Sequence, residues 1–191
     1  MNGRQKVTND LNRVRGIGRR RRVGRLVIDE SFADAVPELS LASEAARPGL
    51  LILRSFGKFY GLAGLRLGFA IGDAADITKL AAASGPWPVS GAAIAVGCRA
   101  LRDDAWAKAA SARLARDCAR LDGMVQSQGW RLVGGASLFR LYETPDALAA
   151  QEKLARSHIW SRVFAQNPTW LRLGFPGAEA EWSRLAEALA R

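Results

Sequence analysis

Histidine and cysteine are scarce in this chain of 191 residues, which contains one histidine and two cysteines. A single histidine, His158, excludes a multi-histidine metal site, and we expect it on the surface of a helix. Cys98 and Cys118 lack the spacing of a metal or redox motif, as is typical of a reduced protein without disulfides. No apolar run is long enough to span a bilayer, and the N-terminus lacks the apolar stretch of a signal peptide. These absences predict a soluble, cytoplasmic protein without a metal.

Acidic residues are nearly missing from the first 25 positions, which hold nine of the 28 basic residues and one of the 18 acidic ones. The net charge of +10 therefore belongs mainly to this short head, and the rest of the chain is nearly neutral. The head contains the basic run Arg19–Arg22 and no sustained apolar period, so we predict that it is disordered or weakly helical and lies outside the main fold. Binding of nucleic acid by this head is the alternative, and we consider it the weaker one.

Short apolar runs separated by turn residues follow the head. Leu26–Ile28 and Leu50–Leu53 are typical of buried strands, and residues 65–71 alternate in the manner of a third strand. Residues 39–46 are expected to form a short helix, and residues 55–64 a glycine-rich loop. Together they predict part of an open α/β sheet.

A second group of elements follows the boundary at Gly85–Pro88. Trp106, Ala110, Leu114, Leu121 and Val125 recur at helical spacing, which predicts a helix over 103–128 that ends at Gly129. Strands are expected at 131–133, 138–142 and 170–175, and helices at 145–156, with Pro145 in its first turn, and at 178–190. We therefore divide the chain into a head (1–25), part of a larger domain (26–84) and a small α/β domain (85–191).

The stretch from Ser55 to Gly68 carries the clearest chemistry. It places Lys58 after a small-residue turn and Arg66 eight positions later, which suits a lysine that binds an aldehyde and an arginine that binds a phosphate. Pyridoxal phosphate contains both groups. Ser55 would supply a hydroxyl to the same phosphate, and Asp29, at the end of a predicted strand, would pair with the pyridine nitrogen. The structural alternatives are a surface lysine, a turn serine, a surface ion pair and a helix-capping aspartate.

Two further residues are candidates for the site. Arg172 stands between apolar neighbours on a predicted strand, where it would be exposed at an edge or directed at a substrate anion. Trp87 would line the cofactor side of the domain junction or belong to the core. The glycines between 61 and 68 match neither a Walker loop nor a dinucleotide-binding fingerprint.

The sequence of residues 55–68 resembles the lysine signature of class I/II aminotransferases, which are fold-type I pyridoxal-phosphate enzymes. With Asp29–Phe32 upstream and Gly85–Gly91 downstream, it most resembles the threonine-phosphate decarboxylases of cobalamin biosynthesis. Histidinol-phosphate aminotransferases are the near relatives, and they usually have tyrosine where this chain has Phe32. The resemblance runs from about Leu26 to the C-terminus. About the first half of the family's length has no counterpart in this chain, so we expect a C-terminal fragment with part of the large-domain sheet and the small domain.

The resemblance implies that Lys58 forms the imine with the cofactor, Asp29 binds the pyridine nitrogen, and Ser55 and Arg66 bind the cofactor phosphate. It also implies that Arg172 binds the substrate carboxylate and that the full-length protein is a homodimer. The implied lyase reaction converts L-threonine O-3-phosphate to (R)-1-amino-2-propanol O-2-phosphate and carbon dioxide. A histidinol-phosphate-type aminotransferase and a non-enzymatic fragment with a nucleic-acid-binding head remain the alternatives.

Overall fold

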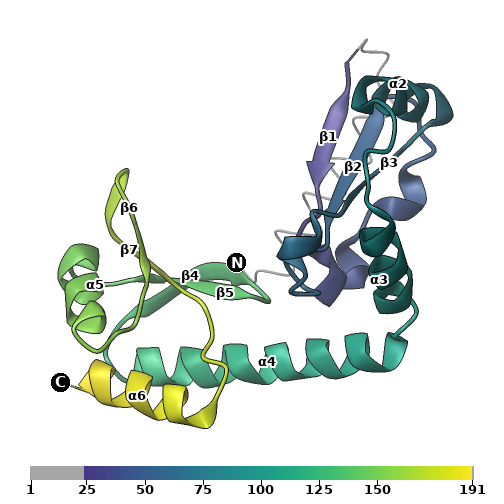
Figure 1. Cartoon of the computed structure of the whole chain (residues 1–191). Helices are drawn as coiled ribbons and strands as arrows, with labels where there is room; N and C mark the ends of the chain where they lie inside the picture. The colour runs from purple at the N-terminus through teal and green to yellow at the C-terminus, as the bar shows by residue number, and fades with distance from the viewer. Residues whose placement is uncertain (1–23, 191) are drawn as a thin grey trace. The chain divides into compact units, whose positions relative to one another are not determined.

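The computed structural model describes residues 24–190, so the predicted head lies outside the described residues except for Gly24 and Arg25. By contacts the chain divides into two compact units, Met1–Arg102 and Asp103–Arg191. The predicted functional division between 26–84 and 85–191 stays a prediction. Figure 1 gives the element labels, and each unit is described by itself.

The first unit contains a three-stranded sheet in the order β1-β2-β3. β1 (Leu26–Asp29) runs parallel to β2 (Leu50–Ser55), and β3 (Gly68–Gly72) runs antiparallel to β2. The first two predicted strands are thus confirmed. The third begins at Gly68 instead of Leu65, because Ala63–Leu65 forms a 3-10 turn, η4, that ends on a left-handed Arg66 with φ of 52°.

The helix predicted over 39–46 is wrong. This region instead contains three 3-10 turns, η1 (Ala33–Ala35), η2 (Pro37–Leu39) and η3 (Ala42–Glu44). The N–H of Leu41 donates to the buried carboxylate of Glu30 at 2.6 Å. The N–H groups of Glu44 and Ala45 donate three residues back, to the carbonyls of Leu41 and Ala42, which is the 3-10 pattern.

Two helices of the first unit were not anticipated from the sequence. Asp73 caps α2 (Ala74–Ser84) by accepting from the N–H groups of residues 75 and 76, and Ser90 caps α3 (Gly91–Leu101). No residue of α2 is buried in the described part of the chain. The core of this unit is small, with the buried residues Leu41, Ala45, Leu50 and Ile52 and partly buried Leu26, Ile28 and Ile71 around them.

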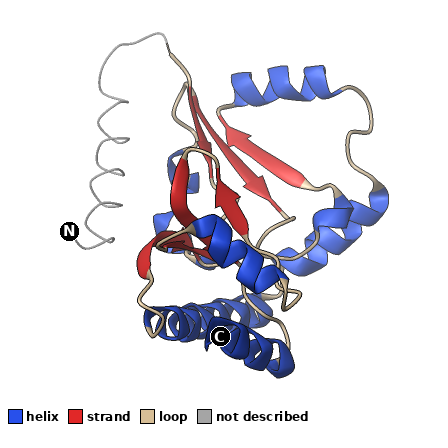
Figure 2. Ribbon diagram, turned by 90° about the vertical axis from the view of Figure 1, so that its left-hand side faces the viewer, coloured by secondary structure: helices blue, strands red, loops and turns tan. Residues whose placement is uncertain are grey.

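The second unit contains a four-stranded antiparallel sheet in the order β4-β5-β7-β6 and three helices (Figure 2). Its elements are α4 (Asp104–Gln126), β4 (Arg131–Ala136), β5 (Phe139–Glu143), α5 (Ala147–Ala155), β6 (Arg162–Phe164), β7 (Asn167–Leu173) and α6 (Glu179–Ala190). All three predicted helices and all three predicted strands of this unit are present. Only β6 was missed, because three residues are too short to show a period.

The core of the second unit is larger than that of the first. It includes Leu121 and Val125 of α4, Tyr142 of β5 and Leu171 of β7, all fully buried, together with residues of α5 and α6. Trp106 is 42% exposed, so it does not belong to the buried stripe predicted for α4.

Three single-residue expectations need correction. Pro145 precedes the N-cap of α5, Asp146, and so lies outside the first helical turn. His158 follows α5 in a turn with φ of 58° and is exposed, so it is not on a helix. Trp87 is 84% exposed, so it is not a core residue. No helix among residues 24–190 is long and apolar enough to cross a membrane.

Candidate functional site

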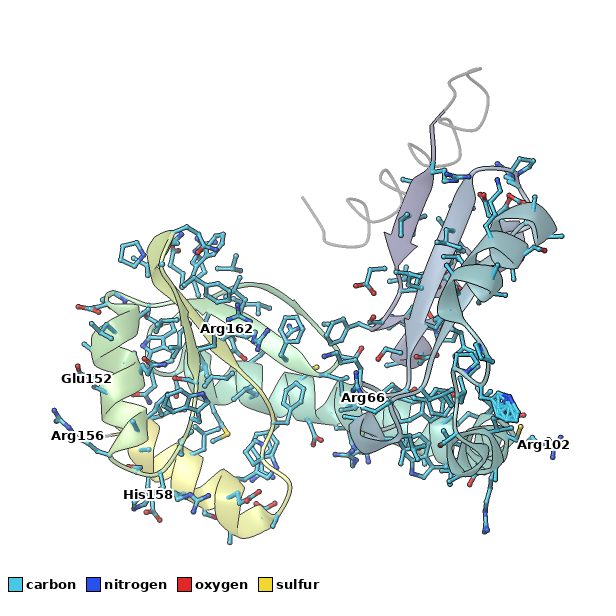
Figure 3. The ribbon with its side chains drawn as sticks, turned by 45° about the horizontal axis from the view of Figure 1, so that its top comes forward. Arg66, Arg102, Glu152, Arg156, His158 and Arg162 are labelled. Atoms are coloured by element: carbon cyan, nitrogen blue, oxygen red, sulfur yellow. The ribbon has the colours of Figure 1, made fainter. Side chains whose placement is uncertain are left out.

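Four of the predicted site residues come from one end of the first unit's sheet. Because β1 and β2 are parallel, their carboxyl ends lie at the same end of the sheet, and these ends carry Asp29 and Ser55. The loop from Phe56 to Leu67 leaves β2 here and returns into β3. It carries Lys58 and Arg66, the latter labelled in Figure 3.

Backbone hydrogen bonds and two buried aromatic rings shape this loop. The N–H of Phe56 donates to the carbonyl of Leu67 at 3.2 Å, which closes the base of the loop. The N–H of Leu62 donates back to the carbonyl of Phe56 at 3.0 Å. Phe56 and Phe59 are buried on either side of the exposed Lys58. The rings therefore anchor the chain while the lysine amine stays accessible.

Gly57, directly before Lys58, packs against the far side of the loop. A Cβ at this position would lie 3.3 Å from Ala63 Cα and 3.4 Å from Ala63 Cβ, tighter than ordinary contacts. A glycine before the lysine therefore lets the two sides of the loop pack closely against each other.

Asp29 is held as an anion. Its Oδ1 accepts hydrogen bonds from the Ser31 hydroxyl at 2.5 Å and from the Ser31 backbone N–H at 2.9 Å. These bonds lower the pKa of Asp29, and the positive charge of Lys58 lowers it further. Asp29 is exposed, so its carboxylate can accept a further partner. This is the protonation state that a carboxylate needs to pair with a protonated ring nitrogen.

Phe32 lies beside the candidate lysine. The Lys58 Nζ is 5.6 Å from the centroid of the Phe32 ring, within the range of a cation–π contact. Unlike a tyrosine, phenylalanine offers no hydroxyl at this position. The ring therefore contributes an apolar surface and a weak attraction for the lysine.

Ser55 and Arg66 offer the donors that were expected to hold a phosphate. The Ser55 Oγ accepts from the Gly57 N–H at 3.2 Å, so its own proton is available to another acceptor. The guanidinium of Arg66 is exposed and donates through one terminal nitrogen to the carbonyl of Ala63 at 3.1 Å. An amine, a carboxylate, a hydroxyl and a guanidinium are thus gathered at one sheet edge, and this set fits pyridoxal phosphate.

A partly buried ionic network beneath these strand ends was missed by the sequence interpretation. Arg54 Nε lies 3.0 Å from Glu30 Oε2, and an Arg54 terminal nitrogen donates to Asp34 at 2.6 Å. Burial raises the pKa of Asp34 more than Arg54 lowers it. Since Glu30 follows Asp29 and Arg54 precedes Ser55, the network joins the two strand ends that carry the site. The available signal was that Glu30 and Arg54 each stand at the end of an apolar strand run.

Arg172 belongs to the second unit, where it lies on β7. Its guanidinium carbon is 4.9 Å from the centroid of the Phe139 ring. It lines a cavity of about 550 Å³ together with Arg162 of the neighbouring strand (Figure 3), Ser161 and the 84% exposed Trp160. The buried Ser161 Oγ has no hydrogen-bond partner within the described part of the chain. The cavity therefore offers two cations, which suits an anion, and Arg162 was not predicted.

No group of three or more histidine, cysteine, aspartate or glutamate side chains among residues 24–190 is placed to hold a metal ion. Pyridoxal phosphate needs none.

Comparison with known proteins shows the family of the chain. The family model for aminotransferase class I and II matches residues 10–189. Threonine-phosphate decarboxylases from Pseudomonas aeruginosa and a Sinorhizobium species are 46% and 43% identical over 169 residues, covering 88% of this chain. A histidinol-phosphate aminotransferase of Mycobacterium tuberculosis is 37% identical over 131 residues, covering 66% of this chain and 36% of its own length.

Solved structures have the same fold. A histidinol-phosphate aminotransferase from Clostridium acetobutylicum matches all of this chain and 58% of its own, with a TM-score of 0.81 and 19% identity. One from Sinorhizobium meliloti, solved with pyridoxal-5'-phosphate, matches 86% of this chain and 47% of its own, with a TM-score of 0.77 and 24% identity. The predicted α/β fold and the predicted pyridoxal-phosphate family are confirmed.

The chain spans about half the length of the curated relatives that it matches, 51% and 50% for the two decarboxylases. The matched half includes the lysine loop and the second unit. About half of each relative has no counterpart in this chain.

Proposed function

Because this chain belongs to the aminotransferase class I and II family, we propose that it serves pyridoxal-phosphate-dependent decarboxylation of L-threonine O-3-phosphate. Identities of 43–46% to proteins named threonine-phosphate decarboxylase support this substrate, against 37% over a shorter stretch for the aminotransferase. The observation that carries the proposal is the gathering of Lys58, Asp29, Ser55 and Arg66 at one sheet edge.

Each residue has a distinct role in the proposal. Lys58 would bind the cofactor's aldehyde carbon through Nζ. Asp29, kept ionised by Ser31, would pair with the protonated ring nitrogen. Ser55 and Arg66 would hold the phosphate by directional hydrogen bonds. The weak attraction between Lys58 and the Phe32 ring would help to orient the amine.

The proposed reaction exchanges a carboxylate for a proton. The bond between Cα and the carboxylate breaks, carbon dioxide leaves, and a proton takes its place on Cα. When bound, pyridoxal phosphate supplies the electron sink for the pair left on Cα. Arg172 would bind the substrate carboxylate, and the second guanidinium of its cavity, Arg162, suits the substrate's other anionic group, the phosphate.

Reductive trapping tests the lysine assignment. The 191-residue chain is mixed with pyridoxal phosphate, reduced with borohydride, digested and analysed by mass spectrometry. We expect the pyridoxyl label on Lys58 and its loss in Lys58→Ala. Lys79→Ala is the matched control, since Lys79 is also exposed in the first unit. Equal labelling of the two lysines, or a label that survives Lys58→Ala, would contradict the assignment.

Product analysis tests the reaction. In a chimera, residues 24–191 replace the matching part of the Pseudomonas aeruginosa relative, and circular dichroism confirms folding. With L-threonine O-3-phosphate we expect carbon dioxide and an amine product without any requirement for a keto acid. A dependence on a keto acid, with no carbon dioxide released, would establish an aminotransferase of the histidinol-phosphate type instead.

A further inference from the structure

One face of the second unit's sheet carries both arginines of the cavity. In the strand register Arg172 of β7 lies directly opposite Leu141 of β5 on one side and Arg162 of β6 on the other. Residues directly opposite each other share a face of a sheet, and so do residues two positions apart along one strand. Phe139 stands two residues before Leu141, so it lies on the same face as the two arginines.

The other face of the sheet packs on the core. Leu171 and Leu173, on either side of Arg172 along β7, are buried in the apolar cluster of the second unit. Tyr142 of β5 is buried in the same cluster. Arg172 and Arg162 therefore lie on the face away from the core, where they line the cavity.

Counter-charges do not hold the two arginines at the cavity. Within residues 103–190, the ion pairs join carboxylates to arginines other than Arg162 and Arg172. No acidic residue of this part of the chain lines the cavity. Like charges at directly opposite positions of a sheet repel each other, which favours side-chain conformations that separate the two guanidinium groups.

An aromatic ring stands beside each arginine instead. The guanidinium carbon of Arg172 is 4.9 Å from the centroid of the Phe139 ring, and that of Arg162 is 5.1 Å from the centroid of the Phe164 ring. Both distances are within the range of a cation–π contact. A ring attracts a guanidinium without neutralising its charge, so each arginine keeps its attraction for a substrate anion.

We infer that Phe139 is a positioning residue for Arg172, whose guanidinium its ring holds at the cavity. Phe164 does the same for Arg162. The inference rests on the proposed function for its purpose, since Arg172 is there proposed to bind the substrate carboxylate and Arg162 the substrate phosphate. It adds the residues that keep both cations in place without a counter-ion.

NMR of the arginine side chains tests the ring contacts. The 191-residue chain is prepared with nitrogen-15-labelled arginine, and Arg172→Lys and Arg162→Lys identify the two Nε–Hε signals by their loss. In Phe139→Leu we expect the Arg172 signal to lose its ring-current shift and its nitrogen relaxation to show greater mobility. The Arg162 signal should stay in place. Phe164→Leu is the matched control and should give the reverse pattern, whereas Phe139→Tyr keeps a ring and should keep the Arg172 shift.

Ligand titrations of the same chain test the consequence for recognition. Calorimetry compares L-threonine O-3-phosphate with the product (R)-1-amino-2-propanol O-2-phosphate, which has no carboxylate. Phe139→Leu should weaken binding of the substrate about threefold or more and change binding of the product by less than about twofold. Phe164→Leu should weaken binding of both compounds, because both carry the phosphate.

The two measurements separate this inference from the proposed function. Equal affinities of the wild-type chain for substrate and product, or no binding of either, would contradict the proposed role of Arg172, and the arginine signals would then decide the inference alone. An Arg172 signal that does not move in Phe139→Leu would overturn the inference. So would an unchanged substrate affinity in Phe139→Leu when Arg172→Lys abolishes binding. Circular dichroism checks each fold, and Phe139→Met, whose flexible side chain fills irregular space, replaces Phe139→Leu if that variant unfolds.

Discussion

The charge state of Asp29 is decided by a neighbour two residues away. Ser31 donates twice to one carboxylate oxygen, from its hydroxyl and its backbone N–H, and this is the largest cause of the low pKa of Asp29. Lys58 adds a smaller effect through its charge. An aspartate at the end of a strand with a serine two residues later is a common turn pattern. In this chain it keeps the carboxylate ionised beside the proposed cofactor lysine.

Replacing Ser31 tests this origin of the low pKa. Because the folded pKa lies below the unfolded value of about 4, the ionised carboxylate stabilises the fold above that pH. This contribution is lost as the pH falls through the folded pKa. In Ser31→Ala the pKa of Asp29 should rise, so the loss begins at higher pH. A carboxyl-carbon NMR titration measures it, with Ser43→Ala, at an exposed serine of η3, as the control. An unchanged pKa of Asp29 in Ser31→Ala would contradict the assignment.

At the scale of elements, the Arg54 network joins the ends of β1 and β2. Arg54 and Asp34 retain only 17% and 16% side-chain exposure, and Glu30 is buried. Removing the arginine would leave two carboxylates side by side without a counter-charge. Such an uncompensated, partly buried charge is far costlier than a broken surface pair.

We therefore expect Arg54→Met to lower the free energy of unfolding by about 3 kcal/mol. Arg113→Met is the control, because Arg113 is 56% exposed and pairs with Asp117 one helical turn away. That variant should lose less than about 0.5 kcal/mol. Urea unfolding followed by circular dichroism measures both. Similar losses in the two variants would show that the network does not hold the strand ends together.

The turn region of β4 and β5 depends on one glycine of an adjacent pair. A Cβ at Gly135 would lie 2.5 Å from the carbonyl oxygen of Phe139, and its φ is +155°. At Gly134 nothing lies within 4 Å, although the pair sits at the register shift between β4 and β5. The two glycines are adjacent in the sequence, but only at Gly135 would a Cβ meet other atoms.

Gly135→Ala should therefore destabilise the second unit by about 2 kcal/mol or more, because the backbone must move to relieve the clash. Gly134→Ala should change stability by less than about 1 kcal/mol. Thermal unfolding followed by circular dichroism compares them. Equal melting temperatures for the two variants would contradict the explanation.

At the scale of the molecule, the two units differ in the size of their buried cores. The second unit buries residues from α4, α5, α6, β5 and β7 in one cluster, whereas the buried cluster at the sheet of the first unit has four residues. The buried apolar area of a unit is the main source of its stability. The unit that carries the candidate cofactor-binding residues therefore has the smaller core to stabilise it.

Hydrogen exchange should reflect this difference. Amides of β5 and β7 should exchange at least about tenfold more slowly than those of β1 and β2, because a larger core raises the free energy of opening. Mass spectrometry of peptides from the 191-residue chain measures the rates. Equal protection of the two sheets would contradict the prediction.

Local sequence patterns were sufficient to predict the strands at 26–28 and 50–53, the long helix α4, the fold class and the family. Strand and helix periods and the contiguous lysine loop are local properties of the sequence. They can therefore be recognised without knowing which distant residues they contact. Other features arise only from tertiary contacts. 3-10 turns stand in place of the helix predicted at 39–46, and the carboxylate of Glu30 accepts from the Leu41 N–H. Arg162 lies opposite Arg172 on neighbouring strands. These features depend on residues far apart in sequence, so no local pattern could reveal them.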